Sequence, residues 1–194
     1  MAFVLELPLS PIEPEQLRAP DLSGVVVPIA TSDLSSGHFN ASLLLVSQEG
    51  KELFCTVSRQ NETLTTHERW IELSRLQSFV HQAKIVLPFS KQSLELVMLA
   101  ARYGWQWHVD GVSSLAQVAR ALTSGAQGIW IRVGSLDHSH ELSGDELCAQ
   151  VRGLIDERSE TKKPLLVATD IVDQDHIERM LQYGCDRIVV SQMT

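Results

Sequence analysis

Short apolar segments alternate with amphipathic segments along the second half of the chain. The apolar segments are rich in β-branched residues, as strands usually are, and lie at residues 84–89, 107–111, 128–133, 165–169 and 187–190. The segments between them carry apolar residues at helical spacing and are long enough to lead from one strand to the next. Because parallel strands buried on both faces read as continuous apolar runs, the pattern predicts βα units in a parallel sheet, either open or closed into a barrel. We favour the closed barrel.

The first 80 residues contain two candidate helices. The segment 34–47 favours a helix, although its apolar part would equally suit a strand. A helix is predicted to begin at Thr65 or Thr66, because Glu68 can complete a capping box there. The helices after the later strands have candidate N-cap residues in Ser90, in Ser113 or Ser114, and in Asp173.

Length and composition favour a single domain spanning residues 1–194. An eight-unit barrel typically takes roughly 250 residues, so the barrel is expected to be short. No apolar run approaches the roughly 18 residues of a membrane span, and the N-terminal segment lacks the basic and apolar regions of a leader peptide. A cytoplasmic protein with no membrane partner is therefore expected.

Charge and cysteine content narrow the function further. The formal net charge is -8 and the basic residues form no cluster, which argues against nucleic acid as a partner. Cys55, Cys148 and Cys185 are odd in number and widely spaced. They suggest neither a disulfide framework nor a Cys-x-x-Cys metal site, so reduced thiols are expected.

Several segments together resemble the transaldolase family, in particular its small branch, the fructose-6-phosphate aldolases. Pro88 and the helical segment 93–104 are similar to that family's lysine-bearing strand and the helix after it. The similarity continues through residues 114–126, 166–170 and 183–185, and so covers residues 80 to 190. The first 80 residues match more faintly, and the resemblance implies that residues 3–7, 24–27 and 52–57 are the first three strands. The resemblance implies an α/β protein with a transaldolase-like (β/α)8 TIM barrel, truncated at its C-terminus. It also implies aldol chemistry through a lysine Schiff base, with no cofactor and no metal.

The position of the Schiff-base lysine is occupied by Val86, which has no nucleophile. Lys84 lies two residues earlier and therefore on the same face of the strand, nearer its N-terminal end. A lysine there is expected at the rim of the barrel with its ammonium in water, because unpaired buried lysines are rare. The alternative is that Lys84 replaces the missing catalytic lysine.

Other positions matching the family's site are also changed. The strand-one aspartate is replaced by Glu6, and the resemblance makes Glu6, Asp110 and Lys84 the catalytic candidates. The candidates for substrate binding are Thr56, Arg132, Ser135 and Asp170. Since reactive groups of βα proteins lie at the C-terminal ends of the strands, we expect Glu6, Asp110, Arg132 and Asp170 to converge at one end of the barrel. Three carboxylates and one arginine there would disfavour a phosphate dianion.

Several alternatives remain open from the residues alone. A divalent metal site is conceivable among His108, Asp110, Asp137, His138, His140 and Asp170, because imidazole and carboxylate groups are common ligands. A carboxylate with a raised pKa could act as a general base. Arg132 could instead neutralise Asp110 or Asp170 in a purely structural network. Trp105, Trp107 and Trp130 are expected to cluster on neighbouring strands, filling the core and the helix interface rather than forming a platform for a sugar.

Two functions follow from this pattern. The favoured one is a non-catalytic or repurposed transaldolase homologue that acts as a subunit or scaffold. The alternative is a divergent aldolase or lyase that uses carboxylate general acid/base residues on a small sugar or sugar phosphate. The last predicted strand ends near Val190, with no segment after it to cover the barrel's outer surface, so a homo-oligomer or a hetero-complex with another protein is expected.

Overall fold

Eight parallel strands close into a barrel in chain order, with the last strand pairing with the first. The structure is a computed structural model that describes residues 3–7, 17–18, 21–29, 37–57, 64–135, 142–158, 162–171 and 173–191. Its strands are β1 (Phe3–Glu6), β2 (Leu22–Ile29), β3 (Glu52–Val57), β4 (Ala83–Pro88), β5 (His108–Asp110), β6 (Gly128–Arg132), β7 (Leu165–Thr169) and β8 (Arg187–Ser191). The predicted (β/α)8 fold is confirmed, and each predicted strand is present.

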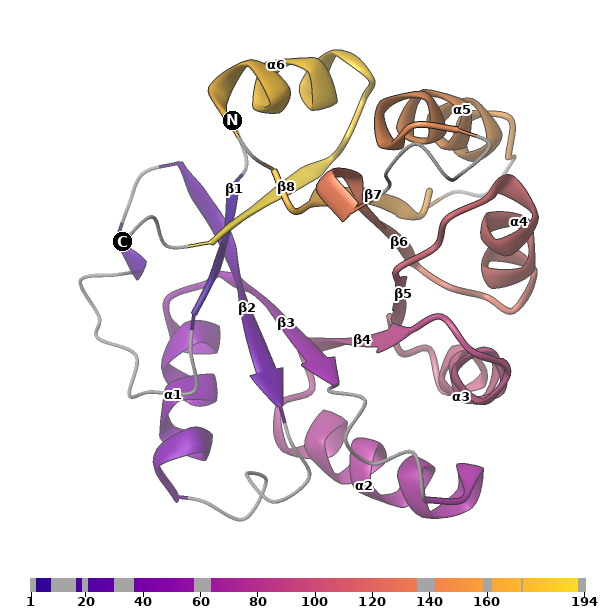
Figure 1. The fold of residues 1–194 in the computed structure, drawn as a ribbon. Helices are drawn as coiled ribbons and strands as arrows, with labels where there is room; N and C mark the ends of the chain where they lie inside the picture. Colours follow the sequence, from indigo (N-terminus) through magenta and orange to yellow (C-terminus); the bar gives the residue numbers. More distant parts are fainter. Residues whose placement is uncertain are drawn as a thin grey trace.

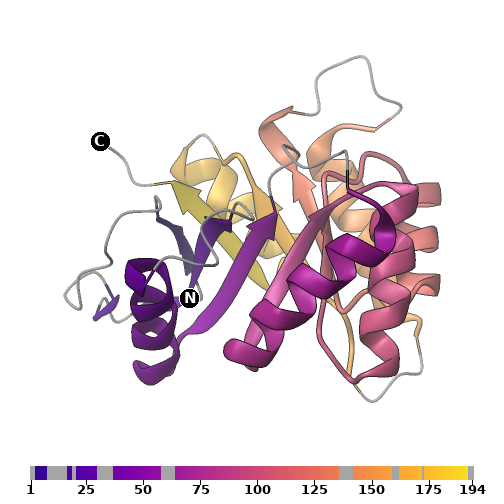
Figure 2. The same cartoon turned by 90° about the horizontal axis from the view of Figure 1, so that it is seen from below.

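The helices lie around the outside of this barrel (Figure 1). They are α1 (Gly37–Gln48), α2 (Thr66–Phe79), α3 (Lys91–Arg102), α4 (Leu115–Thr123), α5 (Gly144–Asp156) and α6 (Gln174–Gln182), with a short 3-10 helix, η4 (Val133–Ser135), after β6. Figure 2 shows the strands running side by side in one direction, so all their C-terminal ends lie at one end of the barrel. No helix among the described residues is long and apolar enough to cross a membrane.

Side-chain caps set where most of these helices begin. Thr65 and Glu68 form the predicted capping box before α2. Ser90, Ser114 and Asp173 each accept a hydrogen bond from a backbone N–H in the first turn of α3, α4 and α6. A second capping box, between Ser143 and Glu146, was missed from the sequence and starts α5 two residues earlier than the predicted 146.

A layer of apolar side chains fills the middle of the barrel. It takes one residue from each strand except β5: Val4, Val26, Phe54, Val86, Trp130, Val167 and Val189. On β5 the place is taken by His108, which is 1% exposed. The indole Nε1 of Trp130 donates a hydrogen bond to Nδ1 of His108 over 3.0 Å. The ring planes of His108 and Trp130 are each inclined to the plane of the Phe54 ring by about 70°.

The three tryptophans fill the core and the helix interface as predicted, but Trp130 does not cluster with Trp105 and Trp107. Trp130 points into the barrel, whereas Trp105 and Trp107 stack on the outside with Trp70 of α2. The reason is the two-residue period of a strand, which places Trp107 on the face opposite to that of His108. The outer tryptophans thus pack between the barrel and its helices.

Gly128 provides the space that the His108 ring occupies, so Gly128→Ala is expected to lower the free energy of unfolding. A Cβ at this position would overlap the imidazole of His108, and overpacking a tight core costs roughly 1–3 kcal/mol. Gly153→Ala is the control, because a Cβ there meets nothing within 4 Å and alanine favours a helix interior by about 1 kcal/mol. Urea denaturation of both variants measures the difference. Equal stabilities would contradict the close packing of Gly128 against His108.

Candidate functional site

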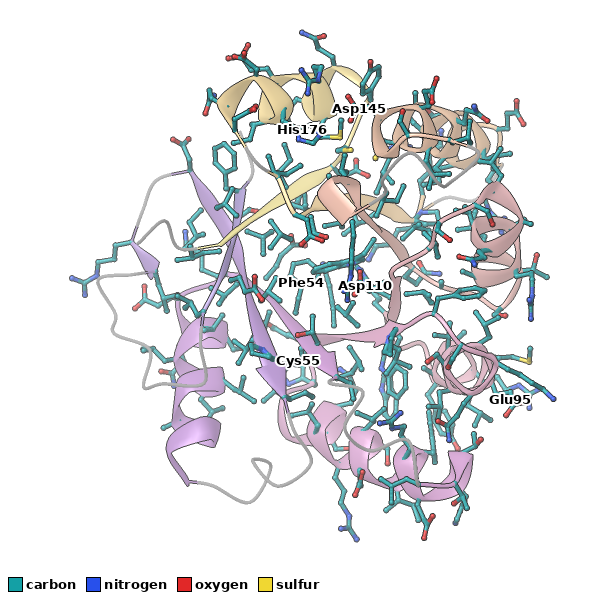
Figure 3. All side chains as sticks on the ribbon, viewed as in Figure 1. Phe54, Cys55, Glu95, Asp110, Asp145 and His176 are labelled. Atoms are coloured by element: carbon teal, nitrogen blue, oxygen red, sulfur yellow. The ribbon has the colours of Figure 1, made fainter. Side chains whose placement is uncertain are left out.

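A cavity of about 490 Å³ opens at the end of the barrel where the strands finish. The described residues that line it are Glu6, Val26, Pro28, Thr56, Val57, Val86, Pro88, Asp110, Trp130, Arg132, Thr169, Asp170 and Val189. Its floor is part of the apolar middle layer of the barrel. Figure 3 shows Asp110 and Phe54 near the centre of the barrel, whereas Glu95, Asp145 and His176 lie among the outer helices.

The walls of the cavity follow from the period of the strands. A residue two positions after an inward-facing one faces inward again, one layer higher. Thr56 therefore stands above Phe54, Asp110 above His108, and Arg132 above Trp130. The same step leads from Val4 to Glu6. The cavity thus gathers five residues named from the sequence: Glu6, Thr56, Asp110, Arg132 and Asp170.

Arg132 and Asp110 form a bidentate ion pair at the centre of the charged wall. The Arg132 Nε donates to both carboxylate oxygens of Asp110, over 3.2 and 3.1 Å, and Nη2 donates to Oδ2 as well. This hydrogen bonding raises the pKa of Arg132 above its ordinary value against the opposing effect of burial, and the charges of Asp110, Asp170 and Glu6 add to it. Arg132 Nη1 donates to no described residue. Arg132 lines the cavity, and its side chain is half exposed.

Asp170 follows β7 and has a left-handed backbone conformation, which residues other than glycine rarely adopt. Its φ is 58°, the one positive value at a non-glycine position in the described part of the chain. Gly134 makes room for it, since a Cβ there would overlap the carbonyl oxygen of Asp170. The left-handed backbone costs of order 1 kcal/mol or more, and such strain is often found at ligand sites.

Thr169 is the cavity residue that the sequence analysis missed. Thr169 is 9% exposed, and its hydroxyl makes no hydrogen bond with any described residue. Thr169 ends β7 two positions after the inward-facing Val167, so the strand period could have identified it. Its neighbour Asp170 was named instead, through the family resemblance.

The side of the cavity formed by β2, β3 and β4 is mostly apolar. Pro28, Val57 and Pro88 line it above Val86, and Thr56 supplies the hydroxyl on this side. No lysine lines the cavity among the described residues. The Val86 side chain is 1% exposed and forms part of the floor, so this wall offers shape and apolar contact in place of a nucleophile.

Lys84 lies in the layer below Val86, away from the cavity. Its ammonium pairs with Glu52 at the beginning of β3 and sits over the Phe54 ring, 5.1 Å from the centroid. Arg187 donates to the same carboxylate over 2.7 Å. Burial tends to raise the pKa of Glu52, but the hydrogen bonds and charges of Lys84 and Arg187 lower it overall. Lys84 thus belongs to an ionic layer at the N-terminal end of the barrel.

The remaining sequence candidates do not form a group in the described structure. The backbone of Ser135 lies in η4, whereas its side chain and residues 137–140 lie outside the described residues. His108 is enclosed in the middle layer, with Nδ1 engaged by Trp130. Within the described residues, no group of three or more His, Cys, Asp or Glu side chains is arranged to hold a metal ion.

The cavity combines an electrophilic group, bases and hydroxyls in one place. Arg132 can stabilise a developing oxyanion, and the carboxylates of Glu6 and Asp170 lie within its electrostatic reach and can exchange protons. Among the described lining residues there are three carboxylates and one guanidinium. The arrangement suits acid–base chemistry on a small ligand.

Comparison with known proteins shows the fold. No protein-family model and no curated protein matches the chain. Among solved structures, a designed cube-shaped, highly porous protein cage built from fused symmetric oligomeric domains matches with a TM-score of 0.60 and 16% identity, over 97% of this chain and 62% of that one. The native KDPGal structure matches with a TM-score of 0.61 and 17% identity, over 97% of this chain and 81% of that one. Because both matches are below 25% identity, they show the fold alone, which is that of a TIM barrel.

Proposed function

We propose that the chain is a divergent, transaldolase-like aldolase or lyase that acts on a small polyhydroxylated carbonyl compound without a lysine Schiff base. The observation that carries the proposal is the position of the Arg132–Asp110 pair, with Glu6 and Asp170 nearby, in a cavity at the C-terminal ends of the strands. In barrels of this fold the reacting groups lie at this end. The aldolase-like fold agrees with this class of chemistry.

The proposed reaction is the cleavage of a carbon–carbon bond next to a carbonyl. The Glu6 carboxylate accepts the proton of a hydroxyl β to the carbonyl, and that oxygen becomes the carbonyl oxygen of the released aldehyde. The electron pair of the broken bond forms an enolate, whose oxygen accepts a hydrogen bond from Arg132 Nη1. The carboxyl group then returns its proton to the enolate carbon, and a ketone leaves. Asp110 holds the guanidinium in place.

A second candidate is a non-catalytic or repurposed homologue that acts as a subunit or scaffold. Val86 favours it, because the defining nucleophile of the family is replaced by a side chain in the cavity floor. Under this candidate the Arg132–Asp110 pair stabilises the rim of the barrel. Association with a second copy or another protein stays a prediction that light scattering can test.

The test is proton exchange at the carbon next to the carbonyl. The purified protein is incubated in D₂O with dihydroxyacetone, D-fructose or 1-amino-1-deoxy-D-fructose, and proton NMR follows loss of the α-hydrogen and release of aldehyde. An enzyme of the proposed class is expected to exchange or cleave at least one of these ketoses. Borohydride added during turnover is expected to trap no adduct on Lys84. The Lys84 ammonium is paired with Glu52 at the N-terminal end of the barrel, whereas the cavity opens at the C-terminal end.

The outcomes separate the two candidates. Exchange without a trapped lysine supports the proposed enzyme. An adduct that mass spectrometry maps to Lys84 would show Schiff-base chemistry and overturn the carboxylate mechanism. Absence of exchange with every ketose, while the chain remains folded by circular dichroism, would favour the non-catalytic homologue.

A further inference from the structure

We propose that Cys148 and Cys185 are a reversible redox pair, two thiols that a peroxide converts into a disulfide between α5 and the turn before β8. Both cysteines are buried free thiols in this structure, and neither lines the cavity. The inference therefore stands apart from the proposed function. It draws on the contact between α5 and this turn, the interaction of the two thiols, and their different exposure.

One face of α5 is held against α6 and the turn that follows α6. At the start of α5, the Asp145 carboxylate pairs with His176 of α6 over 3.1 Å, at the place labelled in Figure 3. Two turns further along α5, Arg152 pairs with Asp186 over 3.2 Å. Positions three and four apart share a face of a helix, so Cys148 lies on this face between the two ion pairs.

The turn that carries Cys185 packs directly on this face of α5. A Cβ on Gly184 would lie 2.7 Å from the Cδ of Arg152, so the backbone of the turn and the stem of that side chain are in close contact. Arg152 Nη1 donates to the carbonyl oxygen of Gly184 over 3.4 Å and to the carboxylate of Asp186 over 3.2 Å. The residues on both sides of Cys185 are therefore bound to α5, one helical turn from Cys148.

The two thiols interact at this contact. Hydrogen bonding with Cys185, together with burial, raises the pKa of Cys148 above that of an ordinary thiol. For Cys55 on β3, burial alone raises the pKa, to about 12. Since neighbouring sulfur atoms can be bridged with little movement of the backbone, Cys148 and Cys185 are placed to form a disulfide, whereas Cys55 is not.

The exposed fraction decides which thiol reacts first. Cys185 is 6% exposed and Cys148 is 0% exposed. The Cys185 sulfur attacks one oxygen of the peroxide, the O–O bond breaks, and the leaving hydroxide takes the thiol proton to form water. The Cys148 sulfur then attacks the sulfur of the resulting sulfenic acid, the S–O bond breaks, and the second hydroxide leaves as water with the Cys148 proton. The peroxide is reduced by two electrons, and the two thiols are oxidised to one disulfide.

The disulfide closes a loop of roughly 37 residues, which contains β7, α6 and the cavity residues Thr169 and Asp170. A crosslink restricts the unfolded chain, so the oxidised protein unfolds at a higher temperature. The crosslink also ties α5 to the turn before β8. Local opening of the segment between them therefore becomes rarer.

The experiment treats the whole chain with hydrogen peroxide at neutral pH and maps the products by digestion without reductant and mass spectrometry. A peptide pair joined through Cys148 and Cys185 is expected, and dithiothreitol is expected to restore both thiols. The reaction is expected to be slow, because a buried thiol with a raised pKa is a poor nucleophile. The oxidised chain should unfold about 5 °C or more above the reduced one, and the amides of residues 165–184 should exchange more slowly with deuterium.

Three variants show whether this pair carries the effect. Cys185→Ala and Cys148→Ala are each expected to abolish both the crosslink and the rise in unfolding temperature caused by peroxide. In Cys148→Ala the sulfenic acid of Cys185 has no partner, so dimedone is expected to label it. Cys55→Ala is the matched control, because it also truncates a buried cysteine, and it should form the crosslink as the wild-type chain does.

Several results would overturn the inference. One is oxidation of Cys185 to sulfinic acid in the wild-type chain without a crosslink to Cys148. Others are a disulfide that includes Cys55 or joins two chains. The inference also fails if the folded wild-type chain keeps three free thiols after prolonged treatment with peroxide.

Discussion

Replacing Arg132 by glutamine is expected to lower kcat for ketose exchange or cleavage by about a hundredfold to a thousandfold, with KM changed much less. The guanidinium is proposed to stabilise an enolate oxygen that carries full charge only late in the reaction. Removing one donor to such an oxyanion typically costs a factor of this size. Because the interaction is stronger in the transition state than with the bound ketose, the loss falls on kcat.

Stability must be separated from catalysis in this experiment. Arg132→Gln leaves the Asp110 carboxylate, whose side chain is 12% exposed, without its bidentate partner, so the variant is expected to be less stable. Adding Asp110→Asn removes the unpaired charge and should recover stability but not kcat. Arg152→Gln is the matched control, because Arg152 makes a comparable bidentate pair with Asp156 on the surface of α5, outside the cavity.

Two results would contradict the assignment. A loss of kcat as large in Arg152→Gln as in Arg132→Gln would show that the effect arises from general destabilisation. Full activity of the Asp110→Asn, Arg132→Gln double variant would place the chemistry elsewhere.

Much of the fold could be predicted because the spacing of apolar residues along the chain shows which positions are buried. The strand at 165–169 was predicted at its observed bounds, since continuous apolar runs are typical of strands covered on both faces. Capping boxes are equally local, which is why the start of α2 was correctly predicted at Thr65 or Thr66. The sequence could not decide between a helix and a strand at the position of α1, because its apolar residues give no clear helical face.

The site was less predictable because it depends on which face of each strand points inward. Once Val86 is known to face the interior, the two-residue period places Lys84 in the layer below it and Pro88 in the layer above. The sequence gives this order but not the partner of Lys84, since Glu52 comes from a different strand. Thr169 was not predicted as a site residue, because the resemblance indicated the next residue, Asp170. The two-residue period, applied to β7, would have found Thr169.

The middle layer of the barrel predicts how the protein responds to acid. Burial, with smaller effects from the charges of Lys84 and Lys162, lowers the pKa of His108 from 6.5 to about 3. Trp130 can only donate, so Nδ1 of His108 must accept and the proton of the neutral ring lies on Nε2, which has no described partner. Protonation of Nδ1 would therefore break the bond to Trp130 as well as place a charge inside the barrel.

The free energy of unfolding is accordingly expected to fall as the pH drops from neutral toward 4.5. Above the unfolded-state pKa of 6.5, neither state binds the proton and His108 gives no pH dependence. Below it, the unfolded state binds a proton that the folded state refuses until about pH 3, so stability decreases by about 1.4 kcal/mol per pH unit and by roughly 2–3 kcal/mol at pH 4.5. Other groups also titrate in this range, so the contribution of His108 is measured as a difference between variants.

His108→Asn provides that difference. The amide oxygen can accept the hydrogen bond of Trp130, and asparagine does not titrate, although the smaller side chain leaves a cavity that lowers stability at neutral pH. Urea denaturation from pH 7 to 4.5 is expected to show a shallower loss of stability in this variant than in the wild-type chain, by up to about one proton's dependence. His81→Asn, at an exposed position between α2 and β4, is the control and should keep the wild-type slope. If His108→Asn and the wild type lose stability in parallel, His108 is not held neutral in the folded protein. The lowered pKa expected from its burial would then be wrong.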